Sequence, residues 1–259
     1  MRPILFEIGS LPIYSYGAML CLAFLMAMLW SFHEAPAEKI NREYLYDLYI
    51  IVMLLSLVGS RAAYVLLNWD FYKVGPWWRV LAFREGGLTF LGGLILAILG
   101  GIIYCHRKKI GFLKYLDFFA PFIALGYAIT RIGCFLNGCC YGVVTSLPWG
   151  VVFPAVDSYP RHPTQLYASA SALLILILLR AFRKHKDYDG FVFTQFMIFY
   201  GVYRFIVEFY RISEPSMGFL TQGQLASLVL IFAGVIIFLW KKGEKRKIGE
   251  TNKKGAGKL

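Results

Sequence analysis

Seven apolar runs, each close to the roughly 20 residues that a helix needs to cross the hydrocarbon of a bilayer, constrain what this chain can fold into. Hydrophobic residues make up 58% of the chain and charged residues only 16%, against about 25% charged residues in an average soluble domain. We therefore predict an all-α integral membrane protein, in which residues 1–240 form a single bundle of seven transmembrane helices. The predicted spans are Ile13–Trp30, Tyr46–Leu67, Leu88–Tyr104, Leu116–Leu136, Thr164–Phe182, Phe191–Phe209 and Gln222–Trp240.

The basic residues predict the orientation of these spans. The formal net charge is +12, and 18 of the 27 Lys and Arg residues follow odd-numbered spans, while six lie on the opposite side. Cytoplasmic segments of membrane proteins carry the excess of Lys and Arg, so we expect the N-terminus outside and the C-terminus in the cytoplasm. Residues 241–259 are then a basic cytoplasmic tail, expected to be disordered and attracted to anionic membrane lipids. Because the positive charge lies in the connections and this tail, we expect no nucleic-acid partner.

The two long connections, at residues 68–87 and 138–163, both lie outside in this orientation. They carry Gly, Pro and Trp, and Pro76-Trp77-Trp78 is typical of a segment in the headgroup layer. Met1–Pro12 lacks the basic start and the small-residue cleavage site of a signal peptide, so the first span is expected to direct insertion. The long outer connections indicate that function lies near the outer face.

The segment Gly126–Gly142, with the sequence GYAITRIGCFLNGCCYG, places Arg131 in an apolar run. A lone arginine at membrane depth costs at least about 2.5–3.5 kcal/mol on insertion scales, so it normally faces protein, water or an anionic ligand. Two interpretations are open. Either the side chain extends to the interface or pairs with a carboxylate, or its guanidinium group clamps a phosphate group with two parallel hydrogen bonds.

Arg204 and Glu208 lie four residues apart in another apolar run and therefore share one helical face. One interpretation is a local ion pair that neutralises both charges. In the other, Glu208 orients Arg204 toward a second anionic group of a ligand, and Tyr200 and Tyr203 add hydroxyl donors. In this second interpretation, these side chains meet Arg131 inside the bundle and hold a phosphate-bearing lipid.

Further polar residues lie near the outer ends of the predicted spans. Arg61 and Tyr64 occur in GSRAAYVL, and Tyr14 and Tyr16 occur in IYSYG. Tyrosines are common at membrane interfaces, so an interfacial role and a site role are both open for them. His162, in RHPTQLY, is either a general acid or base or a residue that caps and packs the loop.

The five cysteines are an odd number, which does not suit a secreted disulfide framework. Cys134, Cys139 and Cys140 form no CxxC pair, and no second ligand cluster accompanies them, so no metal site is predicted. Two roles stay open for these three residues. They either pack as small side chains, or one of the later pair forms a disulfide with Cys134.

Seven segments together resemble the bacterial prolipoprotein diacylglyceryl transferases, in the family's order along most of the chain. They are IYSYG at 13–17, GSRAAYV at 59–65, EGGLTFLGGL at 85–94, GYAITRIGCFLNGCCYG at 126–142, RHPTQLY at 161–167, YGVYRFIVEFYR at 200–211 and GQLASL at 223–228. The resemblance implies an enzyme of the bacterial inner membrane that needs no cofactor. It implies transfer of the sn-1,2-diacylglyceryl group of phosphatidylglycerol to the lipobox cysteine of a prolipoprotein signal peptide, forming a thioether and releasing glycerol-1-phosphate.

The resemblance also implies roles for individual residues. Arg131 matches the family's phosphatidylglycerol-binding arginine, and Arg204 matches its second functional arginine, beside the carboxylate of Glu208. We expect these three residues and Tyr16 to be catalytic. The further residues expected to bind substrate are Asn137, Gly138, Arg61, Tyr64, Tyr14, His162, Gln165, Gly92 and Gly93.

Four positions depart from the family pattern. Leu91 stands in place of a histidine, Cys134 in place of an asparagine, and Cys139 and Ala168 in place of glutamates. A mechanism with a histidine base at position 91 is therefore excluded. Three alternatives follow: a positive field activates the thiol, Tyr14, Tyr16 or His162 assists, or the chain is a paralogue with another acceptor. A lipid or solute transporter is a further alternative, although the spans show no internal repeat.

Overall fold

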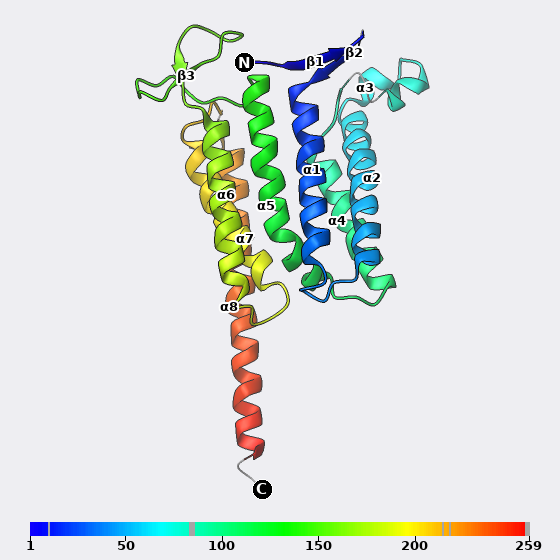
Figure 1. The fold of residues 1–259 in the computed structure, drawn as a ribbon, viewed down its shortest axis with the longest axis vertical. Coiled ribbons are helices and arrows are strands. Elements are labelled where there is room, and N and C mark those ends of the chain that lie inside the picture. Colours follow the sequence, from blue (N-terminus) through cyan, green and yellow to red (C-terminus); the bar gives the residue numbers. More distant parts are fainter. Residues whose placement is uncertain (10, 83–85, 214, 218, 257–259) are drawn as a thin grey trace. The chain divides into compact units, whose positions relative to one another are not determined.

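The computed structural model describes residues 1–9, 11–82, 86–213, 215–217 and 219–256. Within these residues, seven helices are long and apolar enough to cross a membrane. They are α1 (Ser15–Glu34), α2 (Arg42–Leu67), α4 (Phe90–Arg107), α5 (Phe112–Asn137), α6 (Thr164–Arg183), α7 (Phe191–Glu208) and α8 (Gln222–Ala256) (Figure 1). The predicted all-α class with seven spans is confirmed.

The helix ends differ from the predicted ones for local reasons. α1 begins two residues late because Ile13 and Tyr14 belong to β2 (Leu11–Tyr14), which pairs with β1 (Ile4–Ile8) as an antiparallel hairpin. α2 begins before the predicted Tyr46 because Asn41 caps it: the Asn41 side chain accepts a 2.8 Å hydrogen bond from the backbone N–H of Glu43.

At the other end of the chain, α8 continues beyond Trp240 to Ala256, past the ends of α6 and α7 (Figure 1). The division into a bundle over residues 1–240 and a separate tail at 241–259 stays a prediction.

Short elements occupy the connections between the long helices. They are α3 (Trp69–Tyr72) and the 3-10 helix η1 (Trp77–Leu81), followed by the two-stranded pairs of β3 (Val151–Val152) with β4 (Pro160–Arg161) and β5 (Pro215–Met217) with β6 (Leu220–Thr221). Their lengths are below what hydrophobic periodicity can detect. The side chains of Trp77 and Trp78 on η1 are exposed, as expected of a segment in the headgroup layer.

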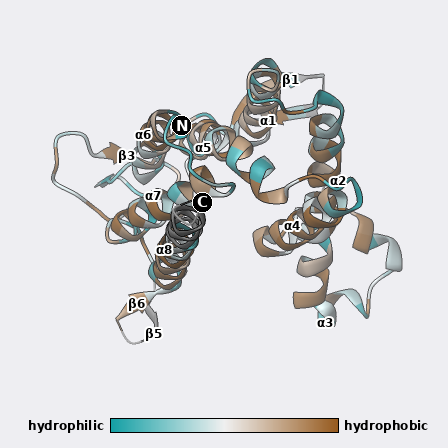
Figure 2. Cartoon of the chain, turned by 90° about the horizontal axis from the view of Figure 1, so that it is seen from below, coloured by the Kyte–Doolittle hydropathy of each residue, from teal (hydrophilic) through white to brown (hydrophobic). Residues whose placement is uncertain are grey.

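The chain divides into two compact units, residues 32–112 and residues 1–31 with 113–259. In both units the helices carry mostly hydrophobic residues along their length, and hydrophilic residues gather at helix ends and connections (Figure 2).

In the unit of residues 32–112, α2 and α4 are in backbone contact through glycines. A Cβ atom added at Gly59 would lie 2.4 Å from the carbonyl oxygen of Gly92, and one added at Gly92 would lie 2.3 Å from Cβ of Ala63. A Cβ atom at Gly93 would lie 2.8 Å from the carbonyl oxygen of Ser56. Small residues at such a crossing allow the close van der Waals packing that holds helices together in lipid.

In the other unit, α5, α6 and α7 share an apolar core, whose buried residues are Ala120, Ala124, Leu125, Ile175, Leu176, Leu179, Phe191 and Val192. A buried carboxylate joins two of these helices. Asp117 of α5 accepts hydrogen bonds from the backbone N–H groups of Gly190 at 2.7 Å and Phe193 at 2.9 Å. It therefore caps the N-terminus of α7, where a negative charge is favourable.

The α2–α4 contact predicts a large effect of adding a single methyl group. Gly59→Ala should lower the midpoint of thermal unfolding in detergent, because overpacking of this kind costs about 1–3 kcal/mol. Gly243→Ala is the matched control, since a Cβ atom at Gly243 meets nothing within 4 Å. It should leave stability unchanged or raise it slightly. Equal unfolding midpoints for the two variants would contradict the close contact.

Candidate functional site

Arg131 lies on α5 and contacts tyrosines instead of a carboxylate. The carbon atom of its guanidinium group lies 4.6 Å from the ring centroid of Tyr127, one helical turn earlier. The side chain also interacts electrostatically with Tyr203 of α7 and with Cys134. Within the part of the chain that the structure describes, no carboxylate forms an ion pair with Arg131. The sequence had left open that Arg131 pairs with a carboxylate. Among these residues, the structure does not show that pairing.

A cluster of Tyr127, Tyr200 and Tyr203 joins α5 to α7; we call it the tyrosine cluster. The hydroxyl groups of Tyr127 and Tyr203 are 3.4 Å apart, and the ring centroids of Tyr127 and Tyr200 are 5.4 Å apart. Arg131 and Arg204 both interact electrostatically with Tyr200 and Tyr203. The two arginines therefore approach the same polar cluster from different helices.

Glu208 ends α7 as a buried carboxylate, with a side chain that is 4% exposed. Its Oε2 lies 2.5 Å from Nη1 of Arg204 and 3.7 Å from Nε of Arg211. Its Oε1 accepts hydrogen bonds from the hydroxyl groups of Ser213 at 2.8 Å and Thr221 at 3.1 Å. The intrahelical pair expected from the sequence exists, and it belongs to a larger network that fixes the position of Arg204.

Gly223, in the first turn of α8, allows α8 to approach this network. A Cβ atom added there would lie 2.6 Å from the carboxyl carbon of Glu208. Sequence reasoning included Gly223 in the segment GQLASL but gave it no role, and it missed Ser213 and Thr221. The signal available was the polar stretch directly before an apolar run.

The loop after α5 begins with a Schellman motif that folds the chain back on the helix. Gly138 has φ +75°, its N–H donates to the carbonyl of Phe135 at 3.1 Å, and the N–H of Cys139 donates to the carbonyl of Cys134 at 3.1 Å. Asn137 is the last residue of α5. Because this motif brings the residue after the glycine over the last helical turn, Cys139 lies beside Cys134.

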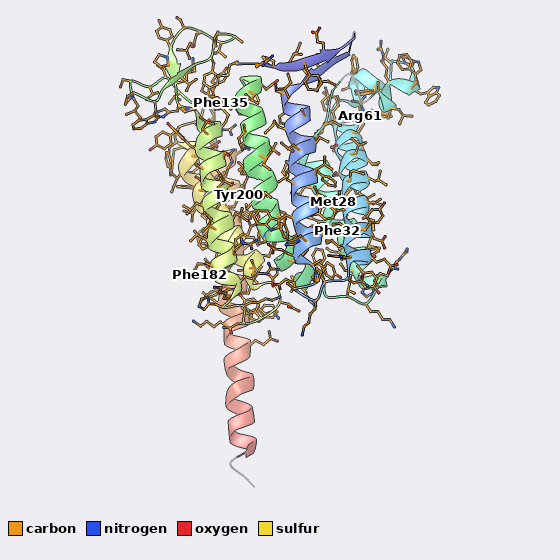
Figure 3. The ribbon with its side chains drawn as sticks, in the orientation of Figure 1. Met28, Phe32, Arg61, Phe135, Phe182 and Tyr200 are labelled. Carbon is orange, nitrogen blue, oxygen red and sulfur yellow. The ribbon has the colours of Figure 1, made fainter. Side chains whose placement is uncertain are left out.

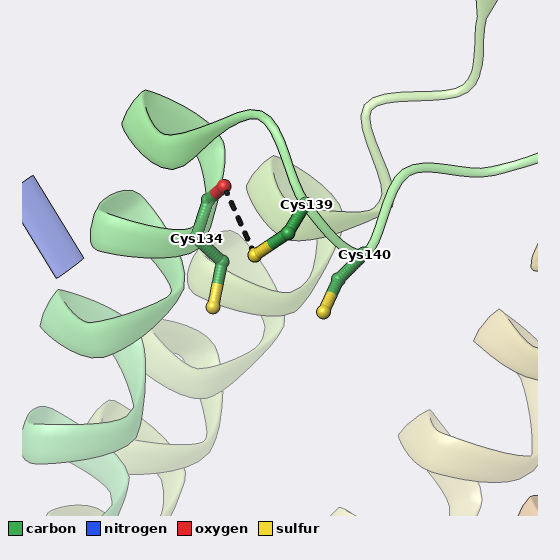
Figure 4. A group of neighbouring side chains, drawn as sticks. All are labelled: Cys134, Cys139 and Cys140. Atoms are coloured by element: carbon green, nitrogen blue, oxygen red, sulfur yellow. Dashed lines mark hydrogen bonds between the residues drawn. The ribbon is translucent and has the colours of Figure 1, made fainter. Parts of the chain in front are cut away.

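Cys140 follows with φ +63°. The Sγ atoms of Cys134, Cys139 and Cys140 all lie within 4.8 Å of one another. Figure 4 shows the three side chains. All five cysteines are free, so the disulfide left open by the sequence is not formed here. Hydrogen bonding from the Cys134 and Cys139 thiols, with the positive charges of Arg131 and Arg211, holds the pKa of the Cys140 thiol below its ordinary value.

The start of α6 holds this loop in place. Thr164 donates its hydroxyl to the carbonyl of Cys140 at 2.7 Å, and Nε2 of Gln165 donates to the carbonyl of Cys139 at 2.6 Å. The Gln165 side chain is buried, and its Oε1 has no hydrogen-bond partner among the described residues. A ligand hydroxyl group could donate a hydrogen bond to this unpaired oxygen, which would satisfy a buried acceptor.

His162 is buried between aromatic residues. Its Nδ1 lies 3.1 Å from the Tyr167 hydroxyl, and its ring centroid lies 5.0 Å from that of Tyr210. Its backbone pairs with the 142–144 segment, through Gly142 N–H to His162 carbonyl at 2.9 Å. Gly142 is required there because a Cβ atom would lie 2.2 Å from the carbonyl oxygen of Tyr210.

Tyr16 lies in the first turn of α1, beside the last turns of α5. Its Cα lies 3.5 Å from the position of a Cβ atom at Gly133, and its hydroxyl interacts electrostatically with Cys134 and Arg131. The N-terminal segment is held there by a 2.9 Å hydrogen bond from the N–H of Arg2 to the carbonyl of Leu136. Tyr14, at the end of β2, is exposed.

The remaining predicted site residues, Arg61, Tyr64, Gly92 and Gly93, belong to the unit of residues 32–112. Arg61 is 3% exposed and lies toward the end of α2 (Figure 3). It donates to the backbone carbonyls of Arg79, Val80, Gly86 and Gly87, at 2.6, 2.8, 2.6 and 3.2 Å. Its guanidinium group therefore holds the connection after α3.

Tyr64 contacts the same connection, since a Cβ atom at Gly87 would lie 2.4 Å from its ring. Gly92 and Gly93 form the α2–α4 contact described above. The structure thus gives all four residues packing contacts within their own unit. A substrate-binding role for them stays a prediction.

Comparison with known proteins gives a consistent result. A family model described as prolipoprotein diacylglyceryl transferase matches residues 3–240. Relatives called phosphatidylglycerol–prolipoprotein diacylglyceryl transferase include one from Finegoldia magna, 37% identical over 92% of this chain and 94% of its own length. Others come from Geobacter sulfurreducens, 34% identical over 95% and 97%, and Clostridium tetani, 33% identical over 92% and 97%.

The family model spans α1 to α7 and continues into α8 as far as residue 240, and the seven apolar helices are those of a multi-pass protein of the bacterial inner membrane. The chain therefore belongs to the prolipoprotein diacylglyceryl transferase family.

Proposed function

We propose that this protein transfers the sn-1,2-diacylglyceryl group of phosphatidylglycerol to the lipobox cysteine thiol of a prolipoprotein signal peptide. The thiol loses its proton, a carbon–sulfur bond forms at the glyceryl carbon, the carbon–oxygen bond to phosphate breaks, and glycerol-1-phosphate leaves with the electron pair. The proposal is supported by the family and by the names of the relatives from three bacteria. The observation that carries it is the approach of Arg131 and Arg204 to one tyrosine cluster.

Arg131 is the proposed phosphate-binding residue. Its guanidinium group is positive, partly buried and without a carboxylate partner among the described residues, so a lipid phosphate would supply the missing anion. Departure of the phosphate adds negative charge to the leaving oxygen. A fixed cation next to that oxygen stabilises this charge more in the transition state than in the ground state.

Arg204 is the proposed second cation, and Glu208 is proposed to act through it. The 2.5 Å contact between Glu208 and Arg204 holds the guanidinium group in one orientation. Ser213 and Thr221 hold the carboxylate in turn. The network therefore fixes the guanidinium charge of Arg204 before the reaction begins. A charge that needs no reorganisation during the reaction is effective in electrostatic catalysis.

The polar groups at the end of α5 are proposed to bind the rest of the headgroup and the acceptor. Gln165 offers a buried oxygen acceptor, and Asn137 and Gly138 lie in the same loop region. Tyr16 is proposed to assist the thiol, since its hydroxyl interacts with Arg131 and Cys134. Tyr14 and His162 stay candidates for substrate binding, and His162 already contacts Tyr167 through Nδ1.

The membrane orientation belongs to the proposal. With the N-terminus outside, the loops after α2 and α5 both lie on the outer face, where a prolipoprotein presents its lipobox cysteine. Phosphatidylglycerol and the signal peptide would then both reach the protein from the membrane. The excess positive charge on the other side would contact anionic lipids, and no nucleic-acid partner is proposed.

A related transferase with the same donor and a different acceptor is the second candidate. Leu91, Cys134, Cys139 and Ala168 are the observations that favour it, because these four positions depart from the family pattern in two of the matched segments and directly after a third.

One assay separates the two candidates. The protein is expressed in membranes that contain phosphatidylglycerol and is mixed with a lipobox peptide, and the mass gain of a diacylglyceryl group on the peptide cysteine is measured. A peptide with serine in place of cysteine is the control. Transfer to the cysteine peptide supports the first candidate. Release of glycerol-1-phosphate without any gain on the peptide supports the second.

Removal of the Arg131 charge should abolish most transfer. We expect Arg131→Ala to lower kcat/KM on the order of 10²–10³-fold, the size of effect seen when one electrostatic group is removed from an active site. Arg131→Lys should recover only part of this, since an ammonium group lacks the planar fork. Arg180→Lys, the same change at the far end of α6, is the control. Full transfer by a normally inserted Arg131→Ala protein would remove Arg131 from the site.

Neutralising Glu208 should affect both stability and transfer. Glu208→Gln keeps the size of the side chain but leaves Arg204 and Arg211 without their shared carboxylate, which costs on the order of 3 kcal/mol for a buried pair. Misplacement of Arg204 should lower transfer by about 10²-fold.

Ser213→Ala, which removes one hydrogen bond to the same carboxylate, should cost about 1 kcal/mol and much less activity. Thermal unfolding in detergent and the transfer assay measure the two effects. Wild-type transfer by Glu208→Gln would exclude a positioning role.

A further inference from the structure

The thiol cluster of Cys134, Cys139 and Cys140 is the one group in the described residues where three or more His, Cys, Asp or Glu side chains bring ligand atoms this close together. Figure 4 shows the three side chains converging from the end of α5 and from the loop that follows it. The glycine at 138 and the positive φ of Cys140 produce this convergence. A separation of five residues in sequence thus becomes a compact set of sulfur atoms.

The loop is fixed in this conformation by buried groups from α6. Thr164 and Gln165 are 3% and 1% exposed, and each donates a hydrogen bond to the carbonyl of a cluster cysteine. A non-glycine residue in the left-handed region, as at Cys140, costs on the order of 1–3 kcal/mol and persists where its surroundings impose it. The cluster is therefore held by the fold and does not depend on a disulfide.

The geometry suits a thiophilic metal ion. Zinc binds cysteine sulfur at about 2.3 Å in a tetrahedron, which places two sulfur ligands about 3.8 Å apart. The thiol sulfurs lie within 4.8 Å of one another, so small side-chain rotations bring them to that separation. No imidazole or carboxylate belongs to the group, and an all-sulfur ligand set favours zinc over magnesium or calcium.

The electrostatic surroundings match such a site. Three thiolates and a divalent ion carry one net negative charge, and the guanidinium groups of Arg131 and Arg211 both interact with Cys140. Three protein ligands leave a fourth coordination position free, which is the arrangement of catalytic zinc sites as opposed to structural ones. A metal ion at this place would be next to the arginine proposed to hold the lipid phosphate.

We propose that Cys134, Cys139 and Cys140 bind a divalent thiophilic metal ion of the zinc class, whose free position takes the thiol of the acceptor cysteine. The inference rests on the proposed function. The acceptor thiol releases its proton to solvent when it binds the ion, because metal-bound sulfur is deprotonated. The bound thiolate attacks the glyceryl carbon, the new carbon–sulfur bond replaces the carbon–oxygen bond, and the phosphate oxygen leaves with the electron pair. The ion thereby supplies the thiolate, and no histidine base is needed at position 91.

Cobalt(II) is the probe for the site, since it replaces zinc and gives visible absorption when sulfur ligands surround it. The protein is purified with Cys21→Ser and Cys105→Ala, so that only the cluster thiols remain. It should take up a single Co²⁺ ion per chain, with bands typical of sulfur coordination, and zinc should displace it. A second protein, with serine at 134, 139 and 140 and with Cys21 and Cys105 intact, should take up none.

The acceptor is tested by the same signal. The lipobox peptide should shift the cobalt spectrum, and the serine peptide should not. Cys139→Ser alone, whose thermal unfolding is checked against wild type, should lower transfer at least about tenfold. Chelator-treated protein should lose transfer and regain it with Zn²⁺.

Several outcomes would overturn the inference. The first two are absence of Co²⁺ uptake and a disulfide among the three cysteines in the active protein. The others are a cobalt spectrum that does not change when the cysteine peptide is added, and full transfer by the metal-free protein. The last of these leaves the proposed function intact. Absence of transfer by the zinc-loaded wild-type protein would instead contradict the proposed function, and the acceptor role of the ion with it.

Discussion

A charge buried in an apolar bundle must be balanced or solvated, and this requirement explains most of the polar architecture of the chain. Three arginines in the long helices meet it in three ways. Arg61 gives its N–H groups to backbone carbonyls, and Arg204 pairs with Glu208. Arg131 lies over the ring of Tyr127 and interacts electrostatically with Tyr203, which stabilises a cation without neutralising it. Of these three arginines, Arg131 is therefore the one whose positive charge is neither paired with a carboxylate nor used to hold backbone carbonyls among the described residues.

Glycines allow these polar groups to reach their partners. Gly223 lets the first turn of α8 approach the Glu208 carboxylate, and Gly142 lets the 142–144 segment lie against Tyr210. Gly138 serves differently, since its positive φ turns the chain at the end of α5. At Gly223 and Gly142 a larger residue would separate two groups whose interaction depends on contact. The high glycine content of the motifs is thus a packing requirement of the polar network.

The positions of the helices could be predicted from the sequence more accurately than the contacts between polar side chains. Long apolar runs indicate membrane spans directly, so the sequence predicted all seven helices. The predicted helix ends were wrong where local contacts set them: the Asn41 cap sets the start of α2, and the β1–β2 hairpin sets the start of α1. The pairing of Arg204 with Glu208 follows from helical spacing alone. The contacts of Glu208 with Ser213 and Thr221 do not, because they depend on how the connection before α8 folds back. The contacts of Arg61 with backbone carbonyls could not be predicted for the same reason, because those carbonyls lie 18 to 26 residues further along the chain.

The cysteines show the limit most clearly. Spacing rules for metal sites assume that ligands come in pairs such as CxxC, and Cys134, Cys139 and Cys140 do not fit them. The Schellman motif changes the distance that matters: the residue after the αL glycine returns to the last helical turn, so positions five apart become neighbours. A helix C-cap can therefore assemble a ligand set that no linear pattern describes. Because that cap also ends the helix that carries Arg131, any chemistry of the thiols is tied to the position of the arginine that we propose binds phosphate.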